Sequence, residues 1–417
     1  MRVFTLVVLG MLSLTGFTQN RIEAQKHIAV LSSDTFYGRG YINDGDKIAA
    51  QYLGQEFERI GLKPVAKKYL HPITLIVNTI NNVELAIGEE LFPEGSSFMV
   101  NPNAQSSQIS ADLKDLSKIT RAGKQYRKAK KCYKKGHVPV LDKQKLSKEA
   151  AEKIKKLKEQ KATTTLWLDK NPIYSVGRNQ TDDLEIYLKE ELWESSYKNL
   201  TIKVDANLKK DYITNNVIGK IEGTEVPDSV IVLCGHYDHL GMLGDAIFYG
   251  ANDNASGIAM LLSLAKYFVE NPQRYSIVFI GFGAEEAGLI GSYQFVSNPP
   301  KGFDLAKTKF VFNMDLMGSG EDGATIVNAT LFKDYFDMLN TINTSNEYLK
   351  VIKKRGNAAN SDHYFFSEAG IPSFFMYTMG AYKHYHNTED NADNLKLSEY
   401  FDKSFFLIRD FVIDLNR

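Results

Sequence analysis

Short apolar runs that alternate with helical patterns in the second half of the chain constrain its fold more than any other feature. The runs are Ser229–Cys234, Ser276–Phe282, Lys309–Phe312 and Pro372–Tyr377. The first two are rich in valine and isoleucine, as fully buried parallel strands are. Between them, Ala255–Phe268 repeats apolar side chains at the spacing of an amphipathic helix. This alternation predicts an α/β fold with a mainly parallel mixed sheet sandwiched by helices.

A potential metal ligand follows each of these runs. His236 follows the first run, Glu285 and Glu286 the second, Asp315 the third and His386 the fourth, and Asp253 stands just before the predicted helix. In open α/β sheets, ligands bind beyond the carboxyl ends of the strands. We therefore expect these side chains to face one crevice.

Histidine nitrogens and carboxylate oxygens are the ligands that suit catalytic zinc. With Glu285 and Glu286 counted as one position, two histidines and three carboxylates exceed the needs of one ion and suit a pair of metals bridged by a carboxylate. Each residue alone has an ordinary alternative. Asp253 or Asn254 can cap a helix, and Glu285 with Glu286 can form an acidic first turn. His239 is expected to be a structural neighbour of the site. Five such residues at strand ends are hard to explain as coincidences, although their pattern does not distinguish the metal ligand from the general base in the Glu285-Glu286 pair.

The motifs occur in a fixed order along the chain. They are His236-Tyr237-Asp238, Gly250–Gly257, Glu285–Ser292, Asp315 and Tyr385-His386, preceded by Leu31–Gly40 and Gly61–Pro64. This order resembles the M28 family of zinc peptidases, and the likeness covers most of the chain outside residues 86–185. One departure follows His386, where the family often has Thr-Pro and this chain has Asn387-Thr388.

The resemblance implies a role for each residue of the set. Asp253 would bridge two zinc ions, His236 and Asp315 would complete one site, Glu286 and His386 would complete the other, Glu285 would be the general base, and Asp238 would hold His236 in place. It further implies a zinc-dependent aminopeptidase that acts on peptides with a free N-terminus. Loops near Gly356–Phe366 and Tyr377–His384 are expected to line the specificity pocket.

Three other functions remain open from the sequence. A glutaminyl cyclase is similar in fold but uses a single zinc, so metal stoichiometry would separate it from a two-metal peptidase. A carboxypeptidase is a further option. A non-catalytic receptor or scaffold would be expected to have lost ligands, and all five are present here. Neither the preferred N-terminal residue nor the oligomeric state follows from the sequence.

The first residues have the pattern of a secretory signal peptide. Arg2 supplies a positive charge, Val3–Phe17 is almost wholly apolar, and Thr18, Gln19 and Asn20 follow. The apolar run is too short to span a bilayer comfortably. We expect cleavage near Gln19 or Asn20 and export to the periplasm or the extracellular space, and no later stretch has the pattern of a membrane span.

A change of composition marks a predicted insertion in this chain of 417 residues. Between Lys118 and Lys161 there are 17 lysines and arginines but only four acidic residues. We expect a signal peptide at 1–19, peptidase parts at 20–85 and 186–417, and a lysine-rich module at 86–185, where the family's protease-associated domain lies. The basic run favours a solvated surface, with a docking surface for an acidic partner as the alternative. The whole chain balances 50 basic against 50 acidic residues, which gives no bias toward nucleic acid or membranes.

Overall fold

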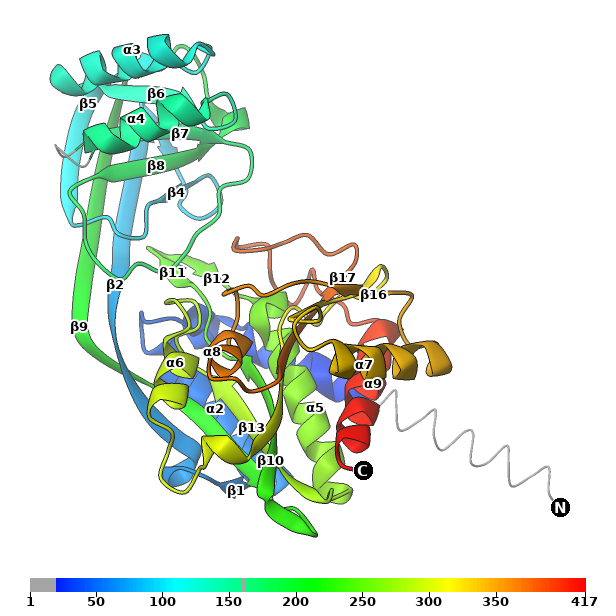
Figure 1. Ribbon diagram of the computed structural model, residues 1–417. Coiled ribbons are helices and arrows are strands. Elements are labelled where there is room, and N and C mark those ends of the chain that lie inside the picture. Colours follow the sequence, from blue (N-terminus) through cyan, green and yellow to red (C-terminus); the bar gives the residue numbers. More distant parts are fainter. Residues whose placement is uncertain (1–19, 159–162) are drawn as a thin grey trace.

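The computed structural model describes residues 20–158 and 163–417 (Figure 1). The predicted signal peptide lies outside the described residues. Within the two described ranges, no helix is both long enough and apolar enough to cross a membrane.

The main sheet is mixed, with parallel strands at its centre. Its strands pair in the order β2 (Leu70–Ile87), β9 (Asn199–Ile221), β13 (Tyr275–Phe282), β10 (Val226–His236), β14 (Thr308–Met314), β17 (Ser373–Met379), β15 (Gly323–Val327) and β16 (Ile352–Lys354). The neighbours β13, β10, β14 and β17 are all parallel, and each contains most or all of one predicted apolar run. The predicted α/β class with a mainly parallel sheet is confirmed.

Helices cover both faces of this sheet (Figure 1). On one face lie α2 (Gly45–Ile60), α5 (Ser256–Glu270), α7 (Lys333–Asn346) and α9 (Glu399–Leu415), and on the other lie α6 (Ile290–Ser297) and α8 (His363–Glu368). Successive strand residues point to opposite faces, so one strand serves both cores. In β10, Ile231 and Leu233 pack in the first core, whereas Val232 packs with Phe295 and Phe366 in the second.

The predicted helices are present with different bounds. The helix expected at Ala255–Phe268 is α5, Ser256–Glu270. Apolar side chains at helical spacing over residues 46–57 also predict a helical stretch from about 20 to 63. The structure divides this stretch into a helix at residues 20–31 and α2, with the turn η1 (Asp34–Arg39) between them. Within η1, Gly38 has a φ of +59°, and a Cβ there would lie 2.4 Å from the carbonyl oxygen of Gly241, so this position requires glycine.

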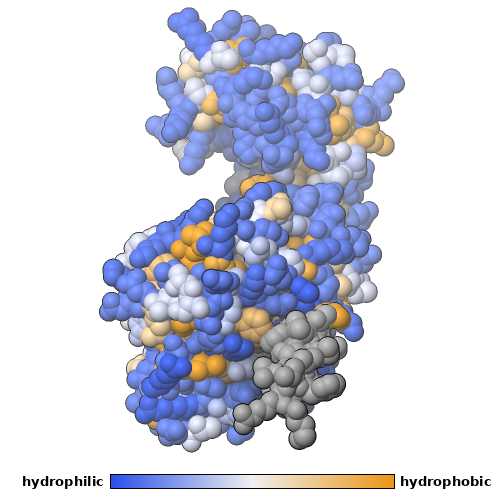
Figure 2. Space-filling view, turned by 90° about the vertical axis from the view of Figure 1, so that its right-hand side faces the viewer, coloured by the Kyte–Doolittle hydropathy of each residue, from blue (hydrophilic) through white to orange (hydrophobic). Residues whose placement is uncertain are grey.

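Two long antiparallel strands, β2 and β9, extend beyond the main sheet (Figure 1). Outside the main sheet, β9 continues into a second sheet. Its strands pair in the order β9, β5 (Ser107–Asp115), β6 (Val138–Asp142), β7 (Thr164–Asp169), β8 (Leu184–Lys189) and β4 (Phe98–Val100). The helices α3 (Ala122–Lys134) and α4 (Lys148–Lys158) cover this second sheet. Figure 2 shows a mostly hydrophilic surface over this region and a constriction between it and the rest of the molecule.

The second sheet overlaps the segment 86–185 that the sequence predicts to be an inserted module. Ala129, Ala150 and Ile154 are buried on the inner sides of α3 and α4, whereas most lysines of both helices are exposed. The remaining short elements are β1 (Lys63–Pro64), β3 (Glu90–Phe92), β11 (Gly241–Leu243), β12 (Ala246–Phe248), η2 (Lys67–Tyr69), η3 (Glu190–Leu192), η4 (Ala251–Ala255) and η5 (Leu305–Lys307).

Candidate metal centre

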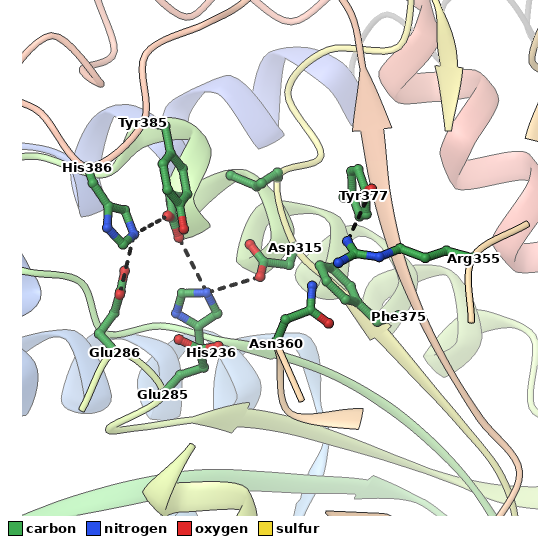
Figure 3. Close-up of a pocket in the computed structure, with 12 residues that line it drawn as sticks. His236, Glu285, Glu286, Asp315, Arg355, Asn360, Phe375, Tyr377, Tyr385 and His386 are labelled. Atoms are coloured by element: carbon green, nitrogen blue, oxygen red, sulfur yellow. Dashed lines mark hydrogen bonds and ion pairs between the residues drawn. The ribbon is translucent and has the colours of Figure 1, made fainter. Parts of the chain in front are cut away.

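The structure brings the predicted metal ligands and Glu285 around one pocket at the carboxyl edge of the parallel strands (Figure 3). His236 ends β10, Asp315 follows β14, Glu285 and Glu286 follow β13, His386 lies in the loop after β17, and Asp253 lies in the turn η4 before α5. The pocket forms here because parallel strands end at the same edge of the sheet.

Asp253 faces both predicted histidine ligands, one with each oxygen. His236 Nε2 lies 3.4 Å from Asp253 Oδ1 and 3.5 Å from Asp315 Oδ2. His386 Nε2 lies 3.2 Å from Asp253 Oδ2 and 3.5 Å from Glu286 Oε2. The set thus divides into two groups that share Asp253.

These separations fit atoms that share a metal ion. Two ligand atoms at about 2.0–2.1 Å from a tetrahedral zinc lie roughly 3.3–3.4 Å from each other. Asp315 Oδ1 is buried and has no hydrogen-bond partner among the described residues. Carboxylates gathered this closely, from Asp253, Glu286 and Asp315, also repel one another unless a cation lies among them. By geometry and by chemistry, the donor set fits divalent metal ions such as zinc.

Both histidines are oriented by backbone carbonyl groups. His236 Nδ1 lies 3.1 Å from the carbonyl oxygen of Asp238, and His386 Nδ1 lies 3.1 Å from that of Tyr174. With the proton on Nδ1, each ring donates to its carbonyl and turns an unprotonated Nε2 toward the carboxylates, which is the tautomer that binds metal. The ring of Tyr385 stacks on that of His386, with centroids 3.9 Å apart.

Asp238 contacts both His236 and the turn that follows β13. Its carboxylate lies 3.8 Å from His236 Nδ1, within ion-pair distance, and its backbone carbonyl lies nearer to the same nitrogen, at 3.1 Å. The carboxylate also accepts hydrogen bonds from the backbone N–H of Glu285 at 3.1 Å and of Glu286 at 3.2 Å. Asp238 therefore positions the turn that carries both glutamates.

The two glutamates have opposite electrostatic surroundings. Burial raises the pKa of Glu285 well above its usual range, and the nearby carboxylates of Glu286 and Asp362 add to this although His236 opposes it. Burial also raises the pKa of Glu286, but His386 and His239 more than offset this and hold it well below its usual range. Glu285 is thus suited to carry a proton, and Glu286 to remain an ionised ligand.

His239 lies among the predicted metal ligands, and with Asp253 and Glu286 it forms a group whose donor atoms are close enough to hold a metal ion, so its role as a structural neighbour stays a prediction. Its ring is fully buried, and Nδ1 lies 2.9 Å from Glu286 Oε1 but 3.9 Å from Asp253 Oδ1. With the proton on Nδ1, His239 donates to Glu286, whose other oxygen lies near His386. This contact orients the glutamate toward the pocket.

The side chain of Asn254, rather than that of Asp253, accepts a hydrogen bond from the first turn of α5, whose N-cap residue is Ala255. Asn254 Oδ1 accepts the backbone N–H of Gly257 at 3.0 Å. Asp390 in turn accepts the backbone N–H groups of Asn252 at 2.8 Å and Asp253 at 3.1 Å. The turn is therefore held by its neighbours, and the Asp253 carboxylate is left to face the histidines.

Arg39 binds the backbone of this turn, a role that its sequence pattern did not predict. It is fully buried, and its guanidinium donates to five backbone carbonyls, those of Leu31, Tyr237, Tyr249, Gly250 and Asp253. The only sequence signal was its position inside the motif Tyr37-Gly38-Arg39-Gly40. Asp390 was missed for a similar reason, since it follows His386 in a loop with no periodic pattern.

The rest of the pocket is lined by Leu316, Arg355, Asn360, Phe375, Tyr377 and Tyr385 (Figure 3). The pocket is open to solvent and has a volume of about 220 Å³. Asn360 and Tyr377 come from the two loop regions expected to line a specificity pocket. Arg355 comes from the end of β16, just outside them.

Comparison with known proteins places this site in a family. Residues 216–410, which contain every predicted metal ligand, match the model of peptidase family M28. The chain therefore carries a peptidase family M28 domain, and the resemblance inferred from its motifs is confirmed.

Two curated relatives illustrate the similarity. Aminopeptidase YwaD of Bacillus subtilis (strain 168) is 28% identical over 218 residues, which cover 47% of this chain and 44% of the relative. The vacuolar membrane protease of Candida albicans (strain SC5314 / ATCC MYA-2876) is 25% identical over 244 residues, 55% of this chain and 27% of the relative. The matched region thus spans less than half of the length of either relative.

Solved structures match over nearly the whole length. BSAP, a zinc aminopeptidase from Bacillus subtilis, has a TM-score of 0.71 at 19% identity and covers 94% of both chains. A peptidase M28 precursor from Shewanella amazonensis SB2B has a TM-score of 0.70 at 14% identity, with 97% of this chain and 96% of that chain covered. At these identities the comparisons establish a common fold.

Proposed function

We propose that this protein is a zinc-dependent aminopeptidase that uses two metal ions in one site. The observation that carries the proposal is the placement of Asp253, whose two oxygens face His236 and His386 at 3.4 and 3.2 Å. In the proposed site, one metal is held by His236, Asp253 and Asp315, and the other by His386, Asp253 and Glu286. Metal ions at these positions supply positive charge that polarises a peptide carbonyl and acidifies an attacking water.

Glu285 is the proposed general base. It accepts the proton of the attacking water and later delivers it to the leaving amine. Its backbone N–H is fixed by Asp238 at 3.1 Å, and its surroundings raise the carboxyl pKa. Both features suit a group that holds a proton for part of the reaction.

The proposed substrates are peptides with a free N-terminus. Asp253, Glu285, Glu286 and Asp315 surround one end of the pocket and favour an amine over a substrate carboxylate at that end. The similarity to Aminopeptidase YwaD supports the same assignment. A bond one residue from the amine would then be cleaved, so residues would be released stepwise.

The test compares a short peptide with its N-acetylated twin at equal concentration, together with elemental analysis of the purified protein. We expect up to two zinc ions per chain, loss of activity with a chelator, and cleavage of the free peptide alone. Equal cleavage of both peptides, or release from the C-terminal end, would contradict the aminopeptidase assignment and favour a carboxypeptidase. A single tightly held metal would favour a glutaminyl cyclase.

We further propose that the protein is exported after removal of residues 1–19. The proposal is supported by Arg2 and the apolar run Val3–Phe17. N-terminal sequencing of the native protein should begin near Gln19 or Asn20, whereas an intact Met1 would contradict cleavage.

A further inference from the structure

The pocket that holds the candidate metal ligands has a second end with the opposite charge. His386 and Glu286 lie at one end, and Arg355, Asn360, Phe375 and Tyr377 lie at the other, beyond Asp315 (Figure 3). None of these four residues has a part in the proposed chemistry.

Arg355 brings an uncompensated positive charge to this end. In the described part of the chain it forms no ion pair, and its side-chain hydrogen bond is a long one from Nη1 to the hydroxyl of Tyr377 at 3.5 Å. The preceding residue differs, because Lys354 Nζ is paired with Asp337 at 3.4 Å. Arg355 is exposed, so its guanidinium is accessible to a ligand from the pocket.

The groups around Arg355 are those of a carboxylate-binding site. A guanidinium presents a planar fork of N–H donors that matches the two oxygens of a carboxylate. Asn360 adds an amide and Tyr377 a hydroxyl to the same end of the pocket, while Phe375, 3% exposed, and Leu316 supply apolar walls. Apolar walls leading to a cation suit a short aliphatic chain that ends in a carboxylate.

We infer that Arg355 binds a carboxylate of the substrate, and that this carboxylate is the side chain of an acidic first residue. The inference rests on the proposed function, which places the substrate amine and the scissile carbonyl at the carboxylate-rich end. The side chain of the first residue then extends past Asp315 toward Arg355. The pocket volume of about 220 Å³ is shared between the candidate metal ligands and the end near Arg355, which leaves space for a side chain to reach from one to the other.

Arg355 would bind the terminal carboxylate of a very short peptide by the same chemistry. Substrates that carry only one of the two carboxylates distinguish the side-chain group from the terminal group. Glutamyl and glutaminyl anilides carry no terminal carboxylate, and their side chains have nearly the same shape. Leucyl-glycine and its C-terminal amide differ only in the terminal carboxylate.

The experiment measures kcat/KM for these four substrates with zinc-loaded wild-type protein, Arg355→Gln and the control Lys353→Gln. Lys353 is a neighbouring exposed cation that does not line the pocket. We expect the wild type to prefer the glutamyl anilide, and Arg355→Gln to lower kcat/KM for it by about 10- to 100-fold, the usual effect of losing a charged hydrogen bond. For the glutaminyl anilide, Arg355→Gln should change kcat/KM by less than about threefold. Lys353→Gln should leave kcat/KM for both anilides at the wild-type value.

A readout independent of turnover is calorimetric binding of free L-glutamate and L-glutamine. The wild type should bind glutamate more tightly than glutamine, and Arg355→Gln should remove the difference. An unchanged ratio of glutamyl to glutaminyl cleavage in Arg355→Gln would overturn the inference. If the substitution instead affects only leucyl-glycine relative to its amide, the carboxylate is the terminal one and the assignment to the side chain is wrong. If the wild type cleaves none of the four substrates, the proposed function fails first.

Discussion

The carboxylate of Asp238 accepts the backbone N–H of Glu285 at 3.1 Å, and it does so from within a fully buried position. The same carboxylate accepts the N–H of Glu286 at 3.2 Å. One side chain at the end of β10 therefore sets the position of the turn after β13, and with it both the proposed base and a proposed ligand.

Asp238→Asn should impair the site although the side chain keeps its size. An amide has one accepting oxygen, so its NH₂ group would oppose one of the two N–H donors. We expect turnover or metal affinity to fall by about 10- to 100-fold, the range typical of residues that support a metal site. Steady-state kinetics and zinc titration would measure this, and wild-type values in both would contradict the proposed positioning role.

Glu285→Gln and Glu286→Gln should have different effects. Glu285→Gln should keep its metal content and slow turnover by about 10²–10⁴-fold, because a general base is lost. Glu286→Gln should reduce the metal bound per chain. Elemental analysis beside kinetics measures both effects, and the reverse pattern would exchange the two roles.

Arg39→Leu should destabilise the protein. Carbonyl groups of Gly250 and Asp253 would lose a buried donor, and each unsatisfied buried group costs about 1–3 kcal/mol. We expect the free energy of unfolding in urea to fall by at least about 3 kcal/mol. Arg59→Leu is the control, since Arg59 pairs with Glu23 and Glu56 at the surface, where such pairs contribute about 0–1 kcal/mol. Equal losses in both variants would contradict the role of Arg39.

His363 should make stability depend on pH. Burial lowers its pKa to about 3, and Arg355 adds to this, although the backbone of Ser361 opposes it. The unfolded state therefore takes up a proton below the ordinary value of about 6.5 while the folded state does not. The contribution of His363 to the free energy of unfolding is fully present above about pH 6.5, and it falls as the pH decreases from about 6.5 to about 3. The loss by pH 5 should be about 2 kcal/mol.

His363→Leu removes the titrating group and keeps an apolar side chain next to Phe375. Urea unfolding at pH 7 and pH 5 should show a smaller decrease for the variant than for the wild type. Identical decreases would show that His363 does not contribute.

The amino-acid pattern was sufficient to predict the parallel strands and the helix α5. It also predicted the residues that stand at the strand ends, because periodicity reports which residues are buried and where an element stops. The positions of the candidate ligands follow from this local information, since His236, Glu286 and Asp315 lie at or just beyond the ends of apolar runs that form parallel strands. Because the carboxyl ends of parallel strands lie at one edge of the sheet, this pattern is enough to expect that the three side chains lie close together.

The tertiary structure decided the contacts between distant segments. The pairing of Asp238 with the Glu285-Glu286 turn, the carbonyl partners of Arg39 and the presence of Arg355 in the same pocket as Asp315 each join segments that are separate in the sequence. The periodicity of apolar residues does not predict such contacts. A buried polar group needs a hydrogen-bond partner, but the residues next to it in the sequence do not specify which partner it finds. The local pattern therefore predicted which residues gather at the pocket, and only the packing of the elements decided what holds each of them in place.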